Sequence, residues 1–282
     1  MRIFKKFLKW FGLTFAVVVL LGGVFIAHSW YFKPVNINIF FARSFLQVAL
    51  QSPEMLSTIH VLEQFGIKGH NAELDDESMA AGDRMFDHLK ESRETLISYA
   101  DEDLSEADRM SKRVAMSLMD MIVEAEKFRF HNYPVNQLFG VQNGFPSFME
   151  STHQVHSVRD AEDYVSRLSQ VGRKFRQVLD GLRHREQLGI LPPQFVVTKV
   201  LEEMRAFVAT PAEEGILMVS LIDKMQEANL PEDDQKRLAL ESKAQVENTV
   251  YPAYGELIAY FETLDDKVSE NHGVWALPDG DE

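Results

Sequence analysis

The sequence contains no cysteine among its 282 residues. This absence excludes disulfide bonds, thiolate zinc sites, iron–sulfur clusters, a cysteine nucleophile and lipoprotein-type acylation of a cysteine. It fits either side of a membrane and does not decide the redox compartment. Glycine and proline are also sparse, with 15 and 10 residues. Their scarcity favours helices over a β-sandwich or barrel, which needs many turns.

Recognisable catalytic motifs are missing as well. The sequence has no H-E-x-x-H, no G-x-S-x-G, no P-loop and no dinucleotide-binding glycine run. His184 is followed by Arg185 and Glu186, but no second histidine stands at the zincin spacing. We therefore assign no catalytic residue and no metal ligand from motifs, and whether the chain is an enzyme stays open.

The charge is acidic and uneven. The net charge is −14, and four basic residues, Arg2, Lys5, Lys6 and Lys9, precede the first apolar run. Without them the remainder carries −14 − 4 = −18. A protein with this much negative charge repels the phosphates of nucleic acids. We therefore expect no nucleic-acid partner.

The N-terminus reads as a membrane segment. Residues 11–27 carry no charge and are flanked by Trp10 and by Trp30-Tyr31-Phe32. A helix of this length can cross ~30 Å of hydrocarbon. Because the basic residues stand before it, the N-terminus is expected inside. We predict a single-pass anchor in the inner (cytoplasmic) membrane over residues 1–32, with residues 33–282 as a helical domain on the periplasmic or extracytoplasmic side.

A cleaved signal peptide is the alternative, since Ala27-His28-Ser29 weakly resembles a small-x-small cleavage site. The apolar run is longer than a usual signal core, and the bulky Trp30 would follow the cut. Both readings send the remainder of the chain across the membrane.

The remainder predicts an all-α fold, a multi-helix array without strand alternation. Asn36 or Asn38, Ser52-Pro53, Ser105-x-x-Asp108 and Ser157-x-x-Asp160 are typical helix starts. The expected helices cover about 37–49, 53–65, 79–99, 105–130, 157–188, 193–204, 211–222 and 231–268. Pro252 lies inside the last of these and is expected to kink it.

Residues 129–157 lack periodicity and predict a long loop, a feature that is often functional. The alternative is that its aromatic residues simply pin the loop onto the core. As weak candidates for substrate binding, the amides could hydrogen-bond a peptide and the aromatics could form apolar walls. These candidates are Asn136, Gln137, Gln142 and Asn143, with Tyr133, Phe139, Phe145 and Phe148.

His153 and His156 stand three residues apart, so one helical turn could present both. They are weak metal candidates only, because zinc needs a third ligand that the sequence does not identify.

Several stretches resemble, in order, the bacterial domain-of-unknown-function 885 family. They are "NIFFARSFLQVALQSPEMLS", "YPVNQLFGVQNGFPSFM", "DAEDYVSRL", "GILPPQFVVTKVL", "VYPAYGELIAYF" and "GVWALPDGDE". Members resemble all-helical zinc metallopeptidases, with proposed metal residues around a His-Glu and a Pro-Gly-His-His stretch later in the chain. This sequence contains neither stretch.

The resemblance therefore implies the N-terminal part of an incomplete, larger helical fold. It implies a truncated, anchored relative that is inactive alone, with zinc expected only if a separate C-terminal half is supplied. The alternative is a complete anchored module that binds peptides or a protein outside the cytoplasm.

Overall fold

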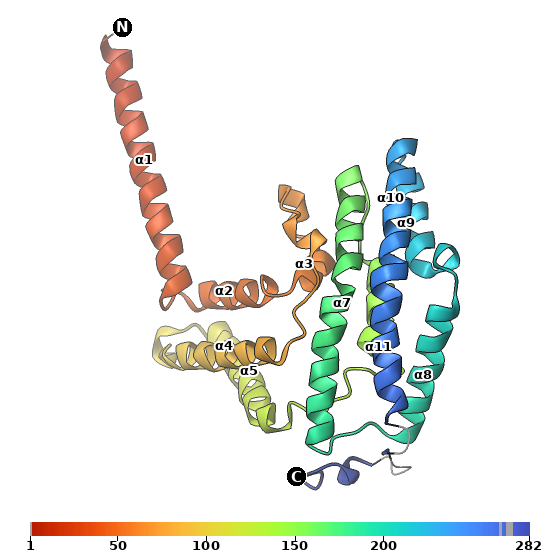
Figure 1. The fold of residues 1–282 in the computed structure, drawn as a ribbon. Helices are drawn as coiled ribbons and strands as arrows, with labels where there is room; N and C mark the ends of the chain where they lie inside the picture. The colour runs from red at the N-terminus through yellow and green to blue at the C-terminus, as the bar shows by residue number, and fades with distance from the viewer. Residues whose placement is uncertain (1, 265–266, 269–272) are drawn as a thin grey trace. The chain divides into compact units, whose positions relative to one another are not determined.

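The computed structural model describes residues 2–264, 267–268 and 273–282, and within these ranges the secondary structure is helical without strands. This confirms the all-α prediction. The chain divides into two compact units, Met1–Val48 with Met85–Glu124, and Ala49–Arg84 with Ala125–Glu282. Figure 1 shows the elements of both.

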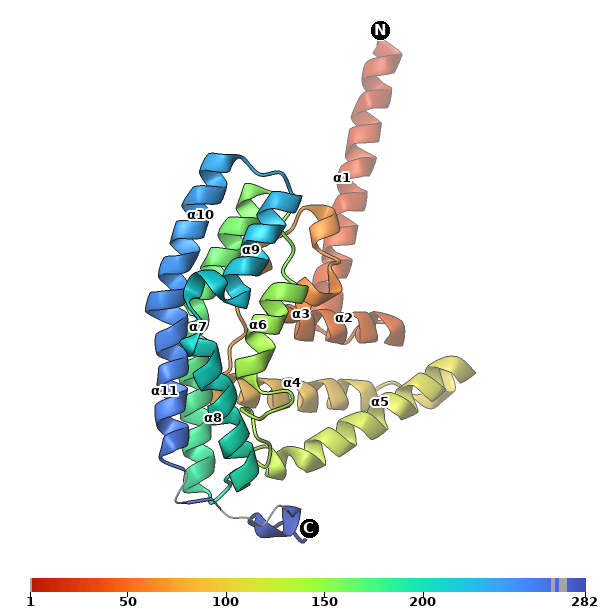
Figure 2. The ribbon, with the colours of Figure 1, turned by 90° about the vertical axis from the view of Figure 1, so that its right-hand side faces the viewer.

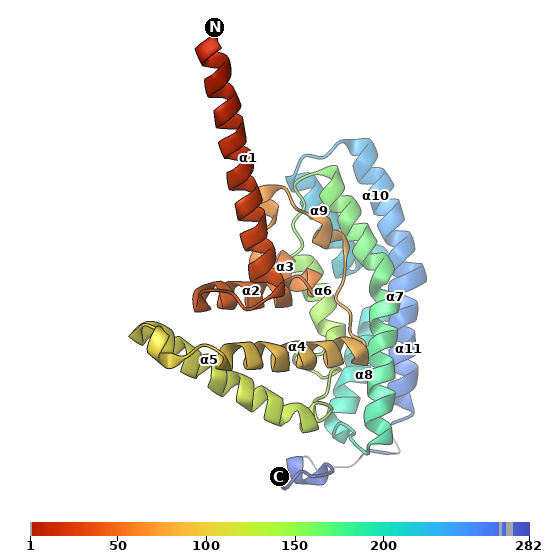
Figure 3. The same ribbon diagram turned by 90° about the vertical axis from the view of Figure 1, so that its left-hand side faces the viewer.

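The first unit contains the apolar N-terminal helix α1 (Arg2–Tyr31), α2 (Ile37–Ala49), most of α4 (Met79–Ile97) and α5 (Glu106–Glu124). The segment Trp10–Tyr31 is long and apolar enough to cross a membrane, and none of it is buried. A signal sequence has the same properties. Figure 3 shows α2 running across the direction of α1.

A small hydrophobic core joins α2, α4 and α5 in this unit. Ile37 and Phe40 of α2 pack against Leu96 and Tyr99 at the end of α4. The Tyr99 hydroxyl donates to the carbonyl of Pro34 at 2.6 Å, so the polar end of this buried ring is satisfied.

The second unit is built around α7 (Val158–Gln187), which Ser157 caps by accepting from the Asp160 N–H. The predicted apolar stripe of α7 is buried along its length, from Tyr164 to Leu182. Figure 2 shows the other helices around it. They are α3 (Pro53–Ile59), α6 (Val141–Ser151), α8 (Gln194–Ala209), α9 (Ile216–Glu227), α10 (Glu232–Gln245) and α11 (Tyr251–Glu262).

Four predicted boundaries were wrong. The helix expected to reach about residue 130 ends at Glu124 as α5 and is followed by a 3₁₀ turn, Ala125–Phe128. α3 ends at Ile59 because His60 adopts a left-handed conformation there, and only a 3₁₀ turn, Glu63–Phe65, precedes Gly66. After Pro211 the chain makes a 3₁₀ turn, Ala212–Glu214, so α9 begins at Ile216. The last helix ends at Glu262 rather than near 268, where residues 265–266 lie outside the described chain.

The helix is irregular just before Pro252, where a kink was predicted. A π-helical turn, Val246–Val250, joins α10 to α11 immediately before this proline. Proline has no N–H and its ring crowds the preceding turn, so the wider turn relieves the clash.

The predicted loop over residues 129–157 is only partly a loop. Residues 141–151 form α6 despite Gly144 and Pro146. Proline removes the donor for the carbonyl four residues earlier, but the Tyr254 hydroxyl donates to that carbonyl, Gln142 O, at 2.5 Å. A tertiary hydrogen bond therefore overrides the local signal that predicted a loop.

Candidate functional site: a polar pocket beside the buried Arg167

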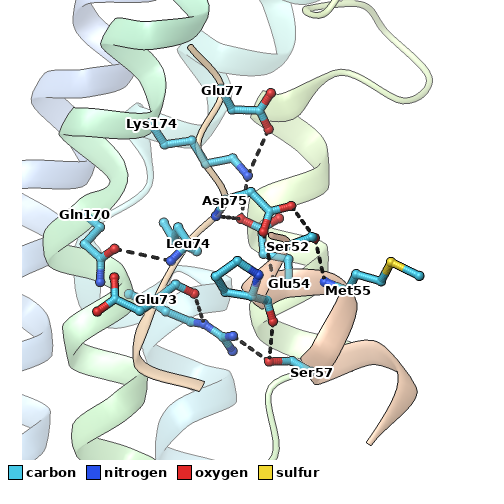
Figure 4. Close-up of polar contacts among 12 residues, drawn as sticks. Ser52, Glu54, Met55, Ser57, Glu73, Leu74, Asp75, Glu77, Gln170 and Lys174 are labelled. Carbon is cyan, nitrogen blue, oxygen red and sulfur yellow. Dashed lines mark hydrogen bonds and ion pairs between the residues drawn. The ribbon is translucent and has the colours of Figure 1, made fainter. Parts of the chain in front are cut away.

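α7 carries a polar stripe beside its core-facing residues. Residues three and four apart lie on one helix face, so these side chains form a row. The segment of residues 72–77, here called the covering segment, lies along this row (Figure 4). The stripe consists of Ser166, Arg167, Gln170, Arg173, Lys174 and Gln177.

The stripe holds the backbone of the covering segment. Ser166 Oγ and Gln170 Nε2 donate to the carbonyl of Ala72, at 2.9 and 2.6 Å. Arg173 Nη2 donates to the Leu74 carbonyl at 2.9 Å, and the Leu74 N–H donates to Gln170 at 3.2 Å. Because an extended backbone has no internal hydrogen-bond partners, these bonds replace those that a helix or a sheet would make.

Arg167 is the most enclosed member of the stripe, with no solvent-exposed surface. Its Nε donates to the Glu73 carbonyl at 2.9 Å, and its Nη2 donates to Ser57 Oγ at 2.6 Å and to the His70 carbonyl at 3.1 Å. Its Nη1 lies 2.7 Å from His153 Nδ1. Burial lowers the pKa of Arg167 to about 10, which still leaves the guanidinium charged at neutral pH. One charged side chain therefore joins α3, the covering segment and the end of α6.

Lys174 forms a second buried centre on the same stripe (Figure 4). Its Nζ lies 2.5 Å from Glu54 and 3.2 Å from Glu77. Burial disfavours its charged form, but these two carboxylates outweigh burial and raise its pKa. Ser52, the predicted cap of α3, also donates to Asp75 at 2.7 Å. The start of α3 is thereby fixed to the covering segment.

A pocket of about 490 Å³ lies next to this network, between residues 57–71 and 152–160. Its lining residues are of polar or charged types and include both signs of charge, although most of the surface that they turn to the pocket is apolar. The lining residues are Ser57, His60, Glu63, Gln64, Lys68, Asn71, Thr152, His153, Gln154, His156 and Asp160.

Asp160 is the enclosed acid of the pocket, at 2% exposure. It lies 2.8 Å from Lys68 Nζ, and it accepts hydrogen bonds from Ser157 Oγ at 2.9 Å and the His156 N–H at 3.1 Å. Burial opposes its charge, but these three partners outweigh burial and lower the pKa of Asp160.

Glu63 is the second acid of the pocket. Its Oε1 lies 2.9 Å from His70 Nε2 and 3.6 Å from His60 Nδ1. Its Oε2 is buried and has no hydrogen-bond partner among the described residues. Burial raises the pKa of Glu63, but hydrogen bonds from its own backbone and His70 outweigh this and hold the pKa below its usual value.

His153 lies in the pocket wall, but both of its ring nitrogens are already engaged. Nδ1 faces Arg167, which can only donate, and Nε2 lies 2.9 Å from the Asp160 carbonyl, which can only accept. This pair of neighbours selects the neutral tautomer with the proton on Nε2. Burial and the charge of Arg167 lower the pKa of His153 to about 3. A metal bound at His153 would have to displace one of these partners.

His156 lies on the same pocket wall and is exposed. The structure therefore brings both histidine candidates to one pocket. No group of three histidine, aspartate or glutamate side chains with metal-binding geometry occurs among the described residues.

The predicted amide candidates mostly organise their own segment. Asn136 accepts from the N–H groups of Leu138 and Phe139 at 2.9 Å each, which closes a turn. Gln142 is buried and donates to the Asn136 carbonyl at 2.7 Å, and Asn143 donates to Glu203 at 2.9 Å. The Gln137 side-chain oxygen is buried without a partner among the described residues. None of the four lines the pocket.

The aromatic candidates separate into different roles. Phe145 is in the core, and the Phe148 ring lies 4.8 Å from the Arg167 guanidinium carbon. Burial raises the pKa of Tyr133. Phe139 is 90% exposed, so it does not pin the segment onto the core.

Sequence analysis missed the network around Arg167 and Lys174. A row of charged and amide side chains on a helix usually indicates a solvated face, and residues 69–76 lie between two predicted helices. Nothing in the sequence pattern indicates that the covering segment folds onto the polar stripe of α7. The one available hint was the length of the polar row on α7.

Most of the pocket and its buried network lies in the part of the chain that matches a family model, but Ser52, Glu54, Ser57 and His60 precede that part. The family described as "Bacterial protein of unknown function (DUF885)" matches residues 61–282. No match was found among curated proteins.

A solved structure, "The crystal structure of the putative lipoprotein from Colwellia psychrerythraea", is similar in fold, with a TM-score of 0.70 and 17% sequence identity. The match covers 84% of this chain and 44% of the other, so this chain spans less than half the length of that protein. Because the family match covers well over half of the sequence, the chain belongs to the domain-of-unknown-function 885 family.

Proposed function

We propose that this chain is a membrane-tethered helical part of a peptidase-like body, and that it forms a wall of a substrate chamber without cleaving peptides alone. The observation that carries the proposal is the unequal coverage of the fold match, 84% of this chain but 44% of the lipoprotein. The same helical arrangement recurs there within a chain that is nearly twice as long, since 84/44 is about 1.9. Zinc hydrolysis needs about three protein ligands and an open position for water. We assign these ligands to the part of the larger fold that this chain does not match.

The proposed tether is α1. A lipoprotein is held at a membrane by covalent lipid, but this chain has no cysteine to carry one. An apolar helix of 22 residues, Trp10–Tyr31, supplies an equivalent anchor. The proposed orientation places the N-terminus in the cytoplasm and the remaining chain on the periplasmic side.

Two measurements test the tether. The mass of the protein purified from cell membranes should include residues 1–29, and protease added to spheroplasts should digest the chain beyond α1. A mature protein that starts near Trp30 would show that the segment is a cleaved signal. Digestion only after cell lysis would reverse the orientation.

The catalytic part of the proposal is tested on the full chain in detergent. We expect no stoichiometric zinc by elemental analysis and no cleavage of a peptide library. Stoichiometric zinc together with cleavage would overturn the proposal. The genomic sequence after codon 282 tests whether a C-terminal half follows, since a frame there encoding the His-Glu and Pro-Gly-His-His stretches would supply one.

A second candidate is peptide capture in the pocket, favoured by its volume of about 490 Å³ and by the polar and charged side chains among its lining residues. Gln64 and Gln154 are exposed at its rim and could pair with a peptide backbone. Calorimetric titration with short peptides should give saturable binding that weakens in Gln64→Ala and Gln154→Ala. The exposed Gln226 lies on α9 and not in the pocket wall, so Gln226→Ala is the matched control. Equal binding by all three variants would exclude this pocket.

A further inference from the structure

Helix α2 is apolar on two opposite sides. On one side Ile37 and Phe40 are buried against the small core of the first unit. On the other side Ala42, Phe45 and Leu46 face outward, with Phe45 49% and Leu46 42% exposed. A helix with apolar residues on two opposite sides is normally covered on both of them, by protein or by membrane. Within the first unit only the inner side of α2 is covered.

The exposed side of α2 is the side away from the end of α4, because Ile37 and Phe40 pack there with Leu96 and Tyr99. α4 and α5 lie on one side of α2, and α1 extends from the other (Figure 3). Arg43 of α2 donates to the carbonyls of Phe32 at 2.7 Å and Ser29 at 3.4 Å, which ties α2 to the end of α1. Since α1 is the helix that can cross a membrane, its exit direction marks where the bilayer lies relative to α2.

The charge distribution supports the same side. The first acidic residue in the sequence is Glu54, so residues 1–53 contain only basic charges. They are Arg2, Lys5, Lys6, Lys9, Lys33 and Arg43. The remaining residues carry 43 acidic and 29 − 6 = 23 basic groups, a net charge of −20. In the proposed orientation, Lys33 and Arg43 are the two of these six that lie on the same side of the bilayer as α2. Anionic lipid headgroups there would attract these two residues and repel the acidic remainder of the chain.

Aromatic side chains mark the corner between the two helices. Tyr31 and Phe32 are 77% and 65% exposed at the end of α1. Tyrosine and tryptophan gather at the membrane–water boundary, where their rings meet both apolar and polar surroundings. These residues place the start of α2 at the level of the headgroups.

We propose that α2 is an interfacial helix, with the face formed by Ala42, Phe45 and Leu46 lying in the headgroup region of the bilayer. The helix has 13 residues and is therefore roughly 20 Å long. It would fix the orientation of the first unit on the membrane instead of leaving it to swing on α1. This inference rests on the tethering part of the proposed function.

The absence of native cysteine allows a direct test, since a single introduced thiol is labelled uniquely. Leu46→Cys is labelled with an environment-sensitive nitrobenzoxadiazole dye in the full chain. The protein is reconstituted in vesicles of phosphatidylethanolamine and phosphatidylglycerol. Quenching is measured with lipids that carry a nitroxide near the headgroup and, separately, with aqueous iodide. The control is Leu240→Cys on α10, another leucine that is exposed, at 70%.

We expect the label at position 46 to be quenched by the nitroxide lipid and several-fold less by iodide than the label at position 240. Iodide quenching equal to that at position 240, with no effect of the nitroxide lipid, would overturn the proposal. Protection from both quenchers would also overturn it, because protein would then cover the face. A chain that does not remain on the vesicles would instead refute the tether.

A second variant checks that the face itself is responsible. In the background of Leu46→Asp, a label at Ala42→Cys should become several-fold more open to iodide, since a charge disfavours the interface. Leu240→Asp should leave the same label unchanged. No difference between these backgrounds would contradict an interfacial role for this face.

Discussion

The Tyr254 hydroxyl donates to the carbonyl of Gln142, 112 residues earlier in the chain, at 2.5 Å. That carbonyl lies four residues before Pro146, the position whose N–H would bond to it in an uninterrupted helix. Tyr254 is 1% exposed, and burial raises its pKa well above the usual value. A side chain of α11 thus replaces the donor that α6 lacks.

We expect Tyr254→Phe to destabilise the protein by about 1–3 kcal/mol, because it leaves a buried carbonyl unpaired. Urea unfolding followed by circular dichroism measures this loss.

A double-mutant cycle gives the control. Pro146→Ala restores a backbone N–H for Gln142, so the loss on Tyr254→Phe should be smaller in that background. Equal losses in both backgrounds would show that the hydroxyl does not substitute for the missing helical donor.

The same pair of residues shows what the sequence could and could not predict. The glycines and the proline in residues 140–146 disfavour a helix locally. The helix that forms there depends on Tyr254, a partner far away in the sequence. Caps are different, since Ser105 and Ser157 accept from N–H groups three residues later at 3.2 and 3.3 Å, as expected. Both partners of a cap stand in one short window.

The candidate site likewise contains residues that the sequence could predict and residues that it could not. His153 and His156 lie in the pocket where residue type and spacing had drawn attention to them. Arg167 had no such signal, because its partners come from α3, the covering segment and the end of α6. Long-range hydrogen bonds leave little trace in a single sequence.

Arg167 supplies the second prediction. Arg167→Met should destabilise the protein by about 3–5 kcal/mol, because several buried acceptors lose a charged donor at once. Arg167→Lys keeps the charge but cannot reproduce the fork, so it should recover only part of the loss. Chemical denaturation measures both variants.

Arg205→Met is the matched control. Arg205 forms an exposed ion pair with Glu262 at 2.6 Å, and such pairs contribute about 0–1 kcal/mol. A similar loss for Arg205→Met and Arg167→Met would show that the buried network has no special role.

Lys224 supplies the third prediction. Its Nζ donates to the carbonyls of Met149 and His153 at 2.7 Å each, near the C-terminal end of α6. Burial lowers its pKa to about 8. We expect Lys224→Met to destabilise the protein by about 1–3 kcal/mol, since carbonyls at a helix end lose their donor. The exposed Lys236, changed to Met, should alter stability by less than about 0.5 kcal/mol.

His153 supplies a prediction for pH dependence. Its pKa is lowered to about 3 in the folded protein from an ordinary value of 6.5, so the unfolded chain binds a proton more readily. The contribution of His153 to the free energy of unfolding is fully present above pH 6.5 and is lost progressively as the pH falls towards 3. In this window the group should contribute a slope of up to about 1.4 kcal/mol per pH unit.

His153→Gln tests this slope, because a glutamine offers an acceptor for Arg167 and a donor for the Asp160 carbonyl but does not titrate. Unfolding free energies between pH 7 and 4 should fall less steeply for this variant than for the native chain. If the two curves run parallel, the folded protein binds a proton at His153 as readily as the unfolded chain does. The arrangement of Arg167 and Asp160 around a neutral ring would then be wrong.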